Sequence, residues 1–598
     1  MPELQVLLPG PWWHALSYRA EVVVPVGARV IVPLGRGTRV GICVGCAEGA
    51  SSTPLKDIYR PLDTAPAIGC AYLHAAKIIA QAFLCSQSDV LRSLLPSAFW
   101  KGEAFPAFEE KADASAYWID FCYRYADAER LQVWREKILS CPRGSLCIFP
   151  EREQAKSFYK SLVGIIPEER LIFWPASGGK AALKSWTKAL SRDDVVVVGG
   201  PGSASAPMRD LRLVILDEES NPAWRTQRQP YFSLRSFAAA RARLCGAQLI
   251  CGGRMPSSRV FMNFAPPEPE VPDERVGTVR ILDLGRAPCL SFRGIDFPLP
   301  LSDVLVKETL ATVNDGGIVF WLLDRRGVTN ELHCSDCGQT VLCERCGSEL
   351  VYEKGQLRCP VCGNREKVPD RCPLCGGMTL QGGSPGLESL FPVAQNLLKG
   401  APVFLWHLDD PKTLTESRKR ISELRKRGGL ILGSRRALSL LDQISPRLIC
   451  WLNADAEARS PHYDSRFNAF SMSLESCWRS ASPREIMFQT FHPRQPWMRA
   501  LQEGWGYFWR REISERKALG FPPHAFLVEV ELPEGWPWAE KLSDELDGAG
   551  LMVMQADPLG RKLSILVPKT AGLRHILEPY FSIGHSHDGF PRIRVWTD

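Results

Sequence analysis

Four pairs of cysteines with C-x-x-C spacing follow one another in the middle of the chain. Each pair can present two thiolates to one metal ion, and a glycine after the second cysteine of every pair lets backbone amides turn toward the sulfurs. Two pairs complete one tetrahedral four-sulfur site, so eight thiolates predict two structural zinc ions. The pairs are Cys334 and Cys337, Cys343 and Cys346, Cys359 and Cys362, and Cys372 and Cys375.

Other chemistry fits this cysteine cluster less well. Four consecutive knuckles in a reducing compartment argue against disulfides. An iron–sulfur cluster is a rival, but the spacing favours zinc. Spacing alone does not choose which pairs share an ion. Residues 333–381 carry six Lys/Arg and six Asp/Glu, and two four-thiolate centres would each add about −2. The module is thus net acidic, which favours protein binding, or guiding a strand by shape, over a phosphate clamp.

Composition sets wide limits on what the rest of the chain does. The 598 residues allow about four domains, and 45% hydrophobic with 23% charged residues is ordinary for globular protein. The net charge of +7 permits nucleic-acid binding without requiring it. No apolar run reaches membrane-spanning length, and the N-terminus lacks the basic stretch of a signal peptide. We therefore expect a cytoplasmic protein that does not enter membranes, with the scattered cysteines as free thiols.

The hydrophobic pattern predicts several domains that would position this cluster. Alternating apolar residues over 20–35 and 39–46 indicate a small β-structure, and a helix is expected over about 70–95. Residues 101–116 are polar and proline-bearing, which is typical of a linker.

Short, fully apolar strands then alternate with helices, which indicates parallel sheets covered on both faces. One set lies near 144–149, 195–200, 211–219 and 247–253, and a second near 317–324, 401–410, 429–434 and 447–455. The cysteine cluster interrupts the second set. Two α/β lobes with an insertion in the second are therefore expected, followed from about residue 504 by a small α+β domain.

Several further motifs, spread over nearly the whole chain, resemble those of the PriA family of replication-restart helicases. They are DEES at 217–220, the PYFSLRSFAAARA run that follows it, GGRMPSS at 252–258, ERKALGFPP at 515–523, RVIVPLG at 29–35 and LKDIYRPLD at 55–63. The cysteine cluster between DRRG (324–327) and GSPGLESLFP (383–392) is similar to the family's zinc module, which interrupts the second helicase lobe in the same way.

The resemblance implies a multidomain α/β fold. It has a small β-rich N-terminal domain, two RecA-like helicase lobes with a two-zinc insertion in the second, and an α+β C-terminal domain. The implied boundaries are a DNA 3′-end-binding domain at 1–105, a linker at 106–116, lobe 1 at 117–275, lobe 2 at 276–332 and 383–500, the zinc module at 333–382 and a C-terminal DNA-binding domain at 501–598. The family's zinc pairing is nested, which implies that the first pair joins the fourth and the second joins the third.

The chain departs from the family where ATP would bind. An active helicase needs a phosphate-binding loop, G-x-x-x-x-G-K-[ST]. Its expected place, 118–131, has neither glycine nor lysine, and SGGKAAL at 177–183 has Ala181 in place of the hydroxyl and Trp174 in place of the first glycine. ATP and Mg²⁺ are therefore not expected as cofactors.

Other parts of the catalytic machinery are altered as well. The resemblance implies that Asp217 positions magnesium and that Glu218 orients the attacking water. Because the phosphate-binding loop is missing, we interpret this Walker B pair as vestigial. Ser220 replaces the family's histidine, Met255 and Pro256 replace a small Ala-Thr, and GSRRALS (433–439) replaces G-T-Q-M. SCWRSASP (476–483) retains at most Arg479 of the late arginine pair.

The family's DNA 3′-end pocket is partly retained. By resemblance it comprises an aromatic-Asp pair, a glycine and a lysine, which correspond here to Leu16, Ser17, Gly35 and Lys56. Gly35 would let a backbone approach closely, and Lys56 would bind phosphate. Without the resemblance, the same residues would be a turn glycine and a surface lysine.

The hypothesis that follows is a bacterial, nucleoid-associated replication-restart protein that binds forked and single-stranded DNA without ATP-driven unwinding. Its protein partners would be the replicative helicase or its loader, recruited through the zinc module, and single-stranded DNA-binding protein. Two alternatives stay open: an active 3′-to-5′ helicase with diverged motifs, and a protein-interaction scaffold that no longer binds DNA.

Overall fold

The computed structural model divides the chain into two compact units. The first contains Met1–Arg124, Glu129–Pro267 and Glu512–Asp598, and the second Tyr125–Ala128 and Glu268–Arg511. The residues that the structure describes are 3–46, 54–111, 113–175, 180–270, 278–289, 299–323, 330–334, 341–345, 350–353, 356–359, 363–378, 380–382, 386–407, 411–458, 462–480, 482–555, 561–585 and 589–598. Within these ranges, no helix is long and apolar enough to cross a bilayer.

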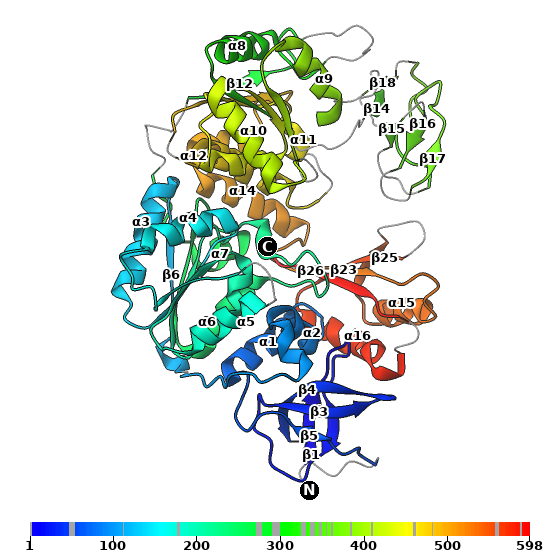
Figure 1. Ribbon diagram of the computed structural model, residues 1–598. Helices are drawn as coiled ribbons and strands as arrows, with labels where there is room; N and C mark the ends of the chain where they lie inside the picture. Colours follow the sequence, from blue (N-terminus) through cyan, green and yellow to red (C-terminus); the bar gives the residue numbers. More distant parts are fainter. Residues whose placement is uncertain are drawn as a thin grey trace. The chain divides into compact units, whose positions relative to one another are not determined.

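An antiparallel sheet of five strands opens the first unit, in the order β2-β1-β4-β3-β5 (Figure 1). The strands are β1 (Glu3–Leu7), β2 (Leu16–Arg19), β3 (Arg29–Leu34), β4 (Gly37–Cys46) and β5 (Arg60–Pro61). The segment before β5 is hydrogen-bonded to two strands of this sheet. Arg19 N–H, in β2, donates to the Lys56 carbonyl, and Tyr59 N–H donates to the Ile31 carbonyl, in β3. Lys56 is therefore fixed beside the end of β2.

The small β-structure expected over 20–35 contains a strand and a turn. β3 covers its second half, whereas residues 20–28 form bends and a turn. Gly27 explains the turn: its φ is +88°, its N–H donates to the Cys43 carbonyl, and a Cβ there would collide with the Ile68 carbonyl oxygen. β1 and β2 were not expected, because each is short and prolines and tryptophans stand between them.

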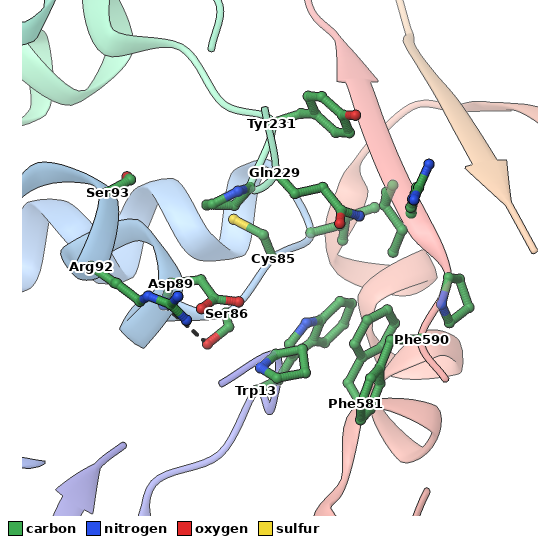
Figure 2. Close-up of a pocket in the computed structure, with 16 residues that line it drawn as sticks. Trp13, Cys85, Ser86, Asp89, Arg92, Ser93, Gln229, Tyr231, Phe581 and Phe590 are labelled. Atoms are coloured by element: carbon green, nitrogen blue, oxygen red, sulfur yellow. Dashed lines mark hydrogen bonds between the residues drawn. The ribbon is translucent and has the colours of Figure 1, made fainter. Parts of the chain in front are cut away.

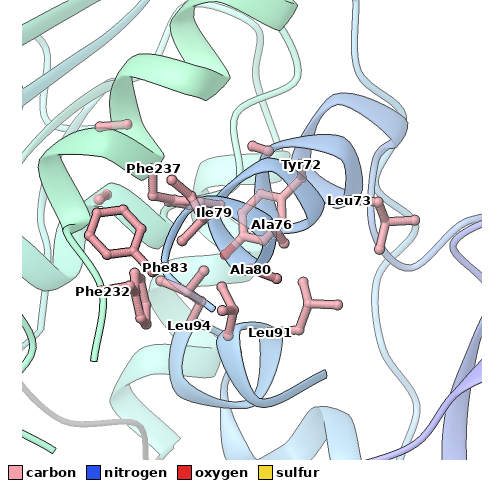
Figure 3. Close-up of a cluster of buried hydrophobic side chains, with 14 of the residues drawn as sticks. Tyr72, Leu73, Ala76, Ile79, Ala80, Phe83, Leu91, Leu94, Phe232 and Phe237 are labelled. Carbon is pink, nitrogen blue, oxygen red and sulfur yellow. The ribbon is translucent and has the colours of Figure 1, made fainter. Parts of the chain in front are cut away.

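Two helices, rather than the single one expected over 70–95, follow the sheet. They are α1 (Cys70–Ala82) and α2 (Gln87–Leu94). The Ser86 hydroxyl accepts from Asp89 N–H at 3.4 Å and so caps a new helix start. Figure 3 shows the buried side chains of α1 and α2 meeting Phe232 and Phe237, and the Tyr72 ring lies 5.2 Å from the Phe237 ring, edge to face.

The segment expected to be a linker is packed against the same unit. Phe108 is fully buried, and its ring lies 6.1 Å from the Tyr72 ring. The Glu110 carboxylate accepts from Tyr72 N–H at 3.1 Å. Burial raises the pKa of Glu110, opposed by the Arg241 guanidinium and by backbone hydrogen bonds.

The first parallel sheet has six strands in the order β6-β11-β10-β7-β9-β8. They are β6 (Trp118–Tyr123), β7 (Gly144–Ile148), β8 (Leu171–Phe173), β9 (Val196–Gly199), β10 (Leu211–Leu216) and β11 (Gln248–Gly253). The helices are α3 (Asp127–Ser140), α4 (Arg152–Leu162), α5 (Lys180–Leu190), α6 (Leu234–Cys245) and α7 (Ser258–Phe264). Alternate residues of β10, such as Ile215 and Leu216, belong to separate buried clusters, so both faces of the sheet are covered as the apolar pattern predicts.

The second unit is built on another six-stranded parallel sheet, in the order β12-β22-β21-β13-β20-β19. Its strands are β12 (Val279–Asp283), β13 (Ile318–Leu322), β19 (Val403–Trp406), β20 (Gly429–Gly433), β21 (Leu448–Trp451) and β22 (Glu485–Thr490). The helices are α8 (Asp303–Asn314), α9 (Leu387–Leu397), α10 (Leu414–Arg427), α11 (Asp455–Ala458), α12 (Ser465–Trp478) and α13 (Pro496–Glu503). α14 (Trp505–Ala518) begins in the second unit, and its residues from Glu512 belong to the first. The expected strands of both lobes are confirmed, and the sequence pattern missed mainly strands at or next to the sheet edges.

Two antiparallel sheets complete the fold. The cysteine module is inserted between β13 and α9, in the order β17-β16-β15-β14-β18, with β14 (Asn330–Cys334), β15 (Val351–Glu353), β16 (Gln356–Arg358), β17 (Arg365–Glu366) and β18 (Leu380–Gly382). The C-terminal sheet has the order β24-β25-β23-β26, with β23 (Phe526–Glu531), β24 (Met552–Gln555), β25 (Lys562–Val567), β26 (Arg592–Trp596), α15 (Ala539–Gly548) and α16 (Thr570–Leu577). The fold is thus the expected multidomain α/β architecture with two RecA-like sheets and a cysteine-rich insertion.

Candidate functional site

Asp217, at the carboxyl end of β10, is held by side chains of α3. Its Oδ1 accepts from Arg130 Nε at 2.7 Å and from Trp134 Nε1 at 2.8 Å. All three side chains are almost completely buried, with exposed fractions of 1%, 1% and 0% for Asp217, Arg130 and Trp134. The carboxylate that the motif assigns to magnesium is therefore neutralised by a cation of the chain itself.

Glu218 is bound by two arginines. Its Oε1 lies 3.0 Å from Arg130 Nη2 and 2.8 Å from Arg254 Nη1. Its backbone adopts φ +48°, an uncommon conformation for a residue with a side chain. Gly253 allows the close approach, because a Cβ there would lie 2.9 Å from Glu218 Cα. Arg254, which precedes the altered Met255 and Pro256, thus has a definite structural partner.

The next two residues of the motif have structural partners too. The Ser220 hydroxyl donates to the Met255 carbonyl at 3.0 Å. Glu219 is fully buried and accepts from Tyr123 Oη at 3.0 Å and from Ser257 N–H at 2.6 Å, and Arg235 Nη1 lies 2.8 Å from its Oε2.

Arg235 joins the acidic motif to the C-terminal domain. Its Nη2 lies 2.6 Å from Asp598 Oδ2. Burial would raise the pKa of Asp598, but Arg235, Arg225 and Arg259 outweigh burial and lower the pKa to about 2. The end of β10 and the residues after β26 are thus linked by an ion pair inside the first unit.

Arg479, from the altered late motif, is bound by acids of the second unit. It follows α12, and its guanidinium lies 2.6 Å from both Asp442 Oδ2 and Glu475 Oε1. Arg479 is 1% exposed. Arg435 also reaches Glu475, at 3.5 Å. Arg479 is therefore bound by residues of its own lobe.

Sequence reasoning missed Arg130 and Trp134 as partners of the acidic motif. Arg130 lies in the segment 118–131 and Trp134 follows it. That segment attracts notice because it lacks glycine and lysine, and its arginine gives no local signal of a distant partner. The structure gives that stretch as β6 and the start of α3. In SGGKAAL, residues 177–179 lie outside the described residues, and α5 begins at Lys180.

The cysteine module brings together three of the four residues predicted for the first zinc site. The sulfurs of Cys334, Cys372 and Cys375 all lie within 4.8 Å of one another, and the Cys334 and Cys375 sulfurs are 3.6 Å apart. This separation is far longer than a disulfide bond and suits thiolates around a single ion with Zn–S near about 2.3 Å. Cys337, the predicted fourth ligand, lies outside the described residues.

Backbone geometry at the fourth pair fits the expected knuckle. Gly376 has φ +73°, and Gly377 N–H donates to Cys375 Sγ at 3.4 Å. Such N–H···S bonds stabilise a thiolate. The three sulfurs and this turn therefore suggest a zinc site.

Two further cysteines lie together in the core of the module. Cys343 and Cys359 belong to one buried cluster with Leu332, Val341, Leu350 and Leu357. Asn364 contacts both the Cys343 knuckle and the Cys359 knuckle. Its side-chain Nδ2 lies 3.6 Å from Cys343 Sγ, and its backbone carbonyl accepts from Cys359 N–H at 2.7 Å. Cys346 and Cys362, the other predicted ligands of the second zinc, lie outside the described residues.

The predicted DNA-end residues all lie on the N-terminal sheet. Leu16 and Ser17 begin β2, and the Ser17 hydroxyl accepts from Gln5 Nε2 at 2.9 Å. Gly35 follows β3 with φ +59° and open space where a Cβ would be, which suits close approach by a ligand. Lys56 is exposed beside β2. No interaction between the side chains of Ser17 and Lys56 is seen.

The N-terminal domain matches a known family. The model described as "3'DNA-binding domain (3'BD)" of PriA matches residues 5–96. That range contains the N-terminal sheet except for the first two residues of β1, together with α1 and α2.

Longer similarity extends to proteins named replication restart protein PriA. The protein of Treponema pallidum is 22% identical over 577 residues, covering 88% of this chain and 86% of the relative. The proteins of Chlamydia muridarum and Bacillus subtilis are 26% and 21% identical over 72% and 78% of this chain, which cover 60% and 61% of those relatives. The chain thus spans less than two thirds of the length of some relatives.

Similarity to solved structures is weaker. Saccharomyces cerevisiae Dbp5 bound to RNA and ADP BeF3 aligns with 65% of this chain and 83% of its own length, at 12% identity and a TM-score of 0.35. The sequence relatives and the domain match agree with each other. The chain is therefore a distant relative of the PriA replication restart proteins over most of its length, with a PriA-type 3′ DNA-binding domain at its N-terminus.

Proposed function

We propose that this chain is a replication-restart factor that binds branched DNA and recruits the replicative helicase without hydrolysing ATP. One observation carries the proposal: Arg130 and Trp134 both donate to the carboxylate of Asp217, which would have to hold magnesium. Hydrolysis of ATP requires magnesium on that carboxylate and a nest of amides with a cation around the phosphates.

Magnesium would have to compete with a buried ion pair for this carboxylate. Removing one partner of such a pair costs about 3–5 kcal/mol, since the other charge stays buried and unpaired. Glu218, which would orient the attacking water, is bound to Arg130 and Arg254. Residues 118–131 contain no phosphate loop that could supply compensating binding energy. These features together favour a motor fold that now serves as a scaffold.

The DNA-binding role rests on the N-terminal domain, which matches PriA's 3′ DNA-binding domain. We propose that Leu16, Ser17, Gly35 and Lys56 receive the 3′ end of a strand, with the C-terminal domain contacting the fork. The cysteine module would contact the replicative helicase or its loader, and single-stranded DNA-binding protein is a further expected partner.

ATP hydrolysis and fork binding should be measured on the same purified full-length chain. We expect fork binding, no DNA-stimulated ATPase above background and no strand separation. Mg-ATP at millimolar concentration should leave the melting temperature unchanged, because a ligand stabilises only a protein that binds it.

The outcomes separate three functions. ATP hydrolysis that disappears in Glu218→Gln would return the chain to the active helicases. Absence of both ATPase and fork binding would indicate an interaction scaffold without DNA. Fork binding without ATPase supports the proposal, and folded Asp217→Asn and Glu218→Gln should then bind forks and recruit the helicase as the wild type does.

The 3′-end pocket has a separate test. Lys56→Ala should weaken binding to forks with a free 3′ end by a few-fold at low salt, because one exposed phosphate contact is lost. Lys77→Ala, on the exposed side of α1, is the matched control. Equal binding by wild type and Lys56→Ala would make the pocket vestigial.

We also propose two structural zinc ions with nested pairing. Cys334, Cys337, Cys372 and Cys375 would hold one, and Cys343, Cys346, Cys359 and Cys362 the other. The sulfur distances at Cys334, Cys372 and Cys375 support the first set, and the Asn364 bridge supports the second.

Elemental analysis tests the zinc count and pairing. Wild type should carry two zincs per chain. Cys372→Ser and Cys343→Ser should each lose one, and Cys70→Ser, at an exposed cysteine of α1, should lose none. In Cys343→Ser, thiol labelling should increase at Cys359 and Cys362. Increased labelling of Cys334 and Cys337 instead would mean consecutive pairing.

A further inference from the structure

A pocket of about 570 Å³ lies where three parts of the first unit meet. Figure 2 shows Asp89 and Arg92 on α2, Gln229 and Tyr231 on a loop before α6, Trp13 before β2, and Phe581 and Phe590 near the C-terminus. This volume is in the range of small-molecule sites. No residue of the acidic motif or of the predicted 3′-end pocket lines it.

One wall of the pocket is a stack of aromatic rings. The Trp13 ring lies 4.4 Å from the Phe581 ring at an interplanar angle of 9°, and Phe581 stacks on Phe590 at 5.7 Å and 24°. The Arg574 guanidinium covers Trp13 at 4.4 Å. Phe590 is only partly buried and lines the pocket. The stack therefore ends in a ring on which another planar group could lie.

The pocket also has polar groups that suit an anionic ligand with hydrogen-bonding edges. Arg92 and Arg592 line it and are exposed. Trp13 also lines the pocket and is 7% exposed. The Gln229 side-chain amide offers both a donor and an acceptor.

We infer that this pocket binds one unpaired nucleotide of a DNA strand, with the base on Phe590 and the phosphates near Arg92 and Arg592. Aromatic stacking combined with arginine contacts is the usual way of holding single-stranded nucleic acid, and stacking contributes about 1–3 kcal/mol per base. Two of the walls come from residues 5–96, the range that matches the 3′ DNA-binding domain.

This inference rests on the DNA-binding part of the proposed function but concerns a different site. The 3′-end residues receive a strand terminus, whereas the pocket would take an internal nucleotide. A probe without ends separates the two. A short circular oligodeoxythymidylate has no 3′ hydroxyl, so the 3′-end pocket should not hold it.

Binding of this circular probe to the full-length chain should be measured by fluorescence anisotropy at low salt. Arg92→Glu and Arg592→Glu should each weaken it about tenfold and reduce its salt dependence. Phe590→Leu, which retains apolar bulk but removes the ring, should weaken it about 5- to 10-fold. Lys77→Glu, the same charge change on exposed α1, should stay within about twofold.

Photo-crosslinking supplies a second readout that does not depend on variants. The same circle with one 5-iododeoxyuridine should crosslink to the peptide containing Tyr231 or to that containing Phe590. Crosslinks elsewhere, or an equal loss in Lys77→Glu, would overturn the inference. So would an acidic peptide with aromatic side chains that binds in an Arg92-dependent way while the circle does not.

The proposed function can survive that failure. If 3′-ended forks still bind in a Lys56-dependent way and the circle does not bind, only the pocket inference falls. If neither probe binds, the DNA-binding proposal falls with it.

Discussion

The altered motifs of the two RecA-like lobes carry opposite charges, and in both lobes these charges are paired with residues of opposite charge. In the first, the acids Asp217 and Glu218 are bound by Arg130 and Arg254. In the second, Arg479 is bound by Asp442 and Glu475. In each lobe the central residue, Asp217 or Arg479, is 1% exposed, and its counter-charge comes from the same lobe.

This symmetry shows that the charged motif residues of both lobes are paired inside the lobe that contains them. An isolated charge is too costly to bury, so acids and arginines inside a lobe need partners of opposite charge. Here each lobe supplies them internally. Retention of a motif residue therefore does not indicate retention of its chemistry, because the residue's partners decide what it can bind.

The strongest challenge to this comparison is to remove the acid of the first lobe. Asp217→Asn should lower the free energy of unfolding by about 3 kcal/mol, because Arg130 loses its closest anion while buried. Urea unfolding measures the loss, with Asp57→Asn, whose carboxylate is 66% exposed in its pair with Arg19, as the control. In an enzyme that reserves this acid for magnesium, stability would be unaffected.

A double-mutant cycle sharpens the same point. Arg130→Met with Asp217→Asn should cost less than the sum of the two single variants, since neither charge is then left alone. Strict additivity would mean that the two side chains do not stabilise each other.

The second lobe should respond in the same direction but less strongly. Arg479→Leu should lower stability by about 2–3 kcal/mol, because Glu475 retains Arg435 at 3.5 Å and Asp442, which is 27% exposed, stays partly hydrated. Arg499→Leu, at an exposed ion pair with Glu503, is the control. A loss no larger than the control's would show that the late-motif arginine is not part of the core, and the symmetry would fail.

Sequence could predict the fold and the grouping of cysteines better than it could predict these ion pairs. The cysteines stand three residues apart within each pair, so their chemistry is visible locally. Arg130 and Asp217 are 87 residues apart and meet only because α3 packs near the end of β10. No periodicity encodes that contact. β12 was missed because it is an edge strand whose sequence, VRILD, carries two charges. β22, which lies next to β12, was missed because EIMFQT begins with Glu485 and includes polar residues.

A smaller effect is expected where the acidic motif joins the C-terminal domain. The pKa of Asp598 is lowered to about 2. A lowered carboxyl pKa stabilises the fold above the unfolded pKa of about 3.9, and this stability disappears as pH falls toward 2. Asp598→Asn should therefore cost about 2 kcal/mol at pH 7 and almost nothing near pH 2, as measured by melting curves across pH. A pH-independent loss would mean that its contacts with the arginines are not electrostatic.

Asp89 supplies the inverse case and the smallest effect. It lines the 570 Å³ pocket proposed to bind a nucleotide. Burial raises the pKa of Asp89 to about 6, and Arg92 only partly opposes this rise. A carboxyl whose folded pKa is raised destabilises the fold when ionised. The cost is absent below the unfolded pKa of about 3.9, grows as pH rises, and is complete above about 6.

Asp89→Asn should thus stabilise the chain by about 1 kcal/mol at pH 8, after allowance for partial exposure, and leave it unchanged at pH 4. Opposite signs for Asp89→Asn and Asp598→Asn at neutral pH would distinguish an acid with a sufficient counter-charge from one without. Equal signs would mean that Asp89 has a stronger partner than Arg92.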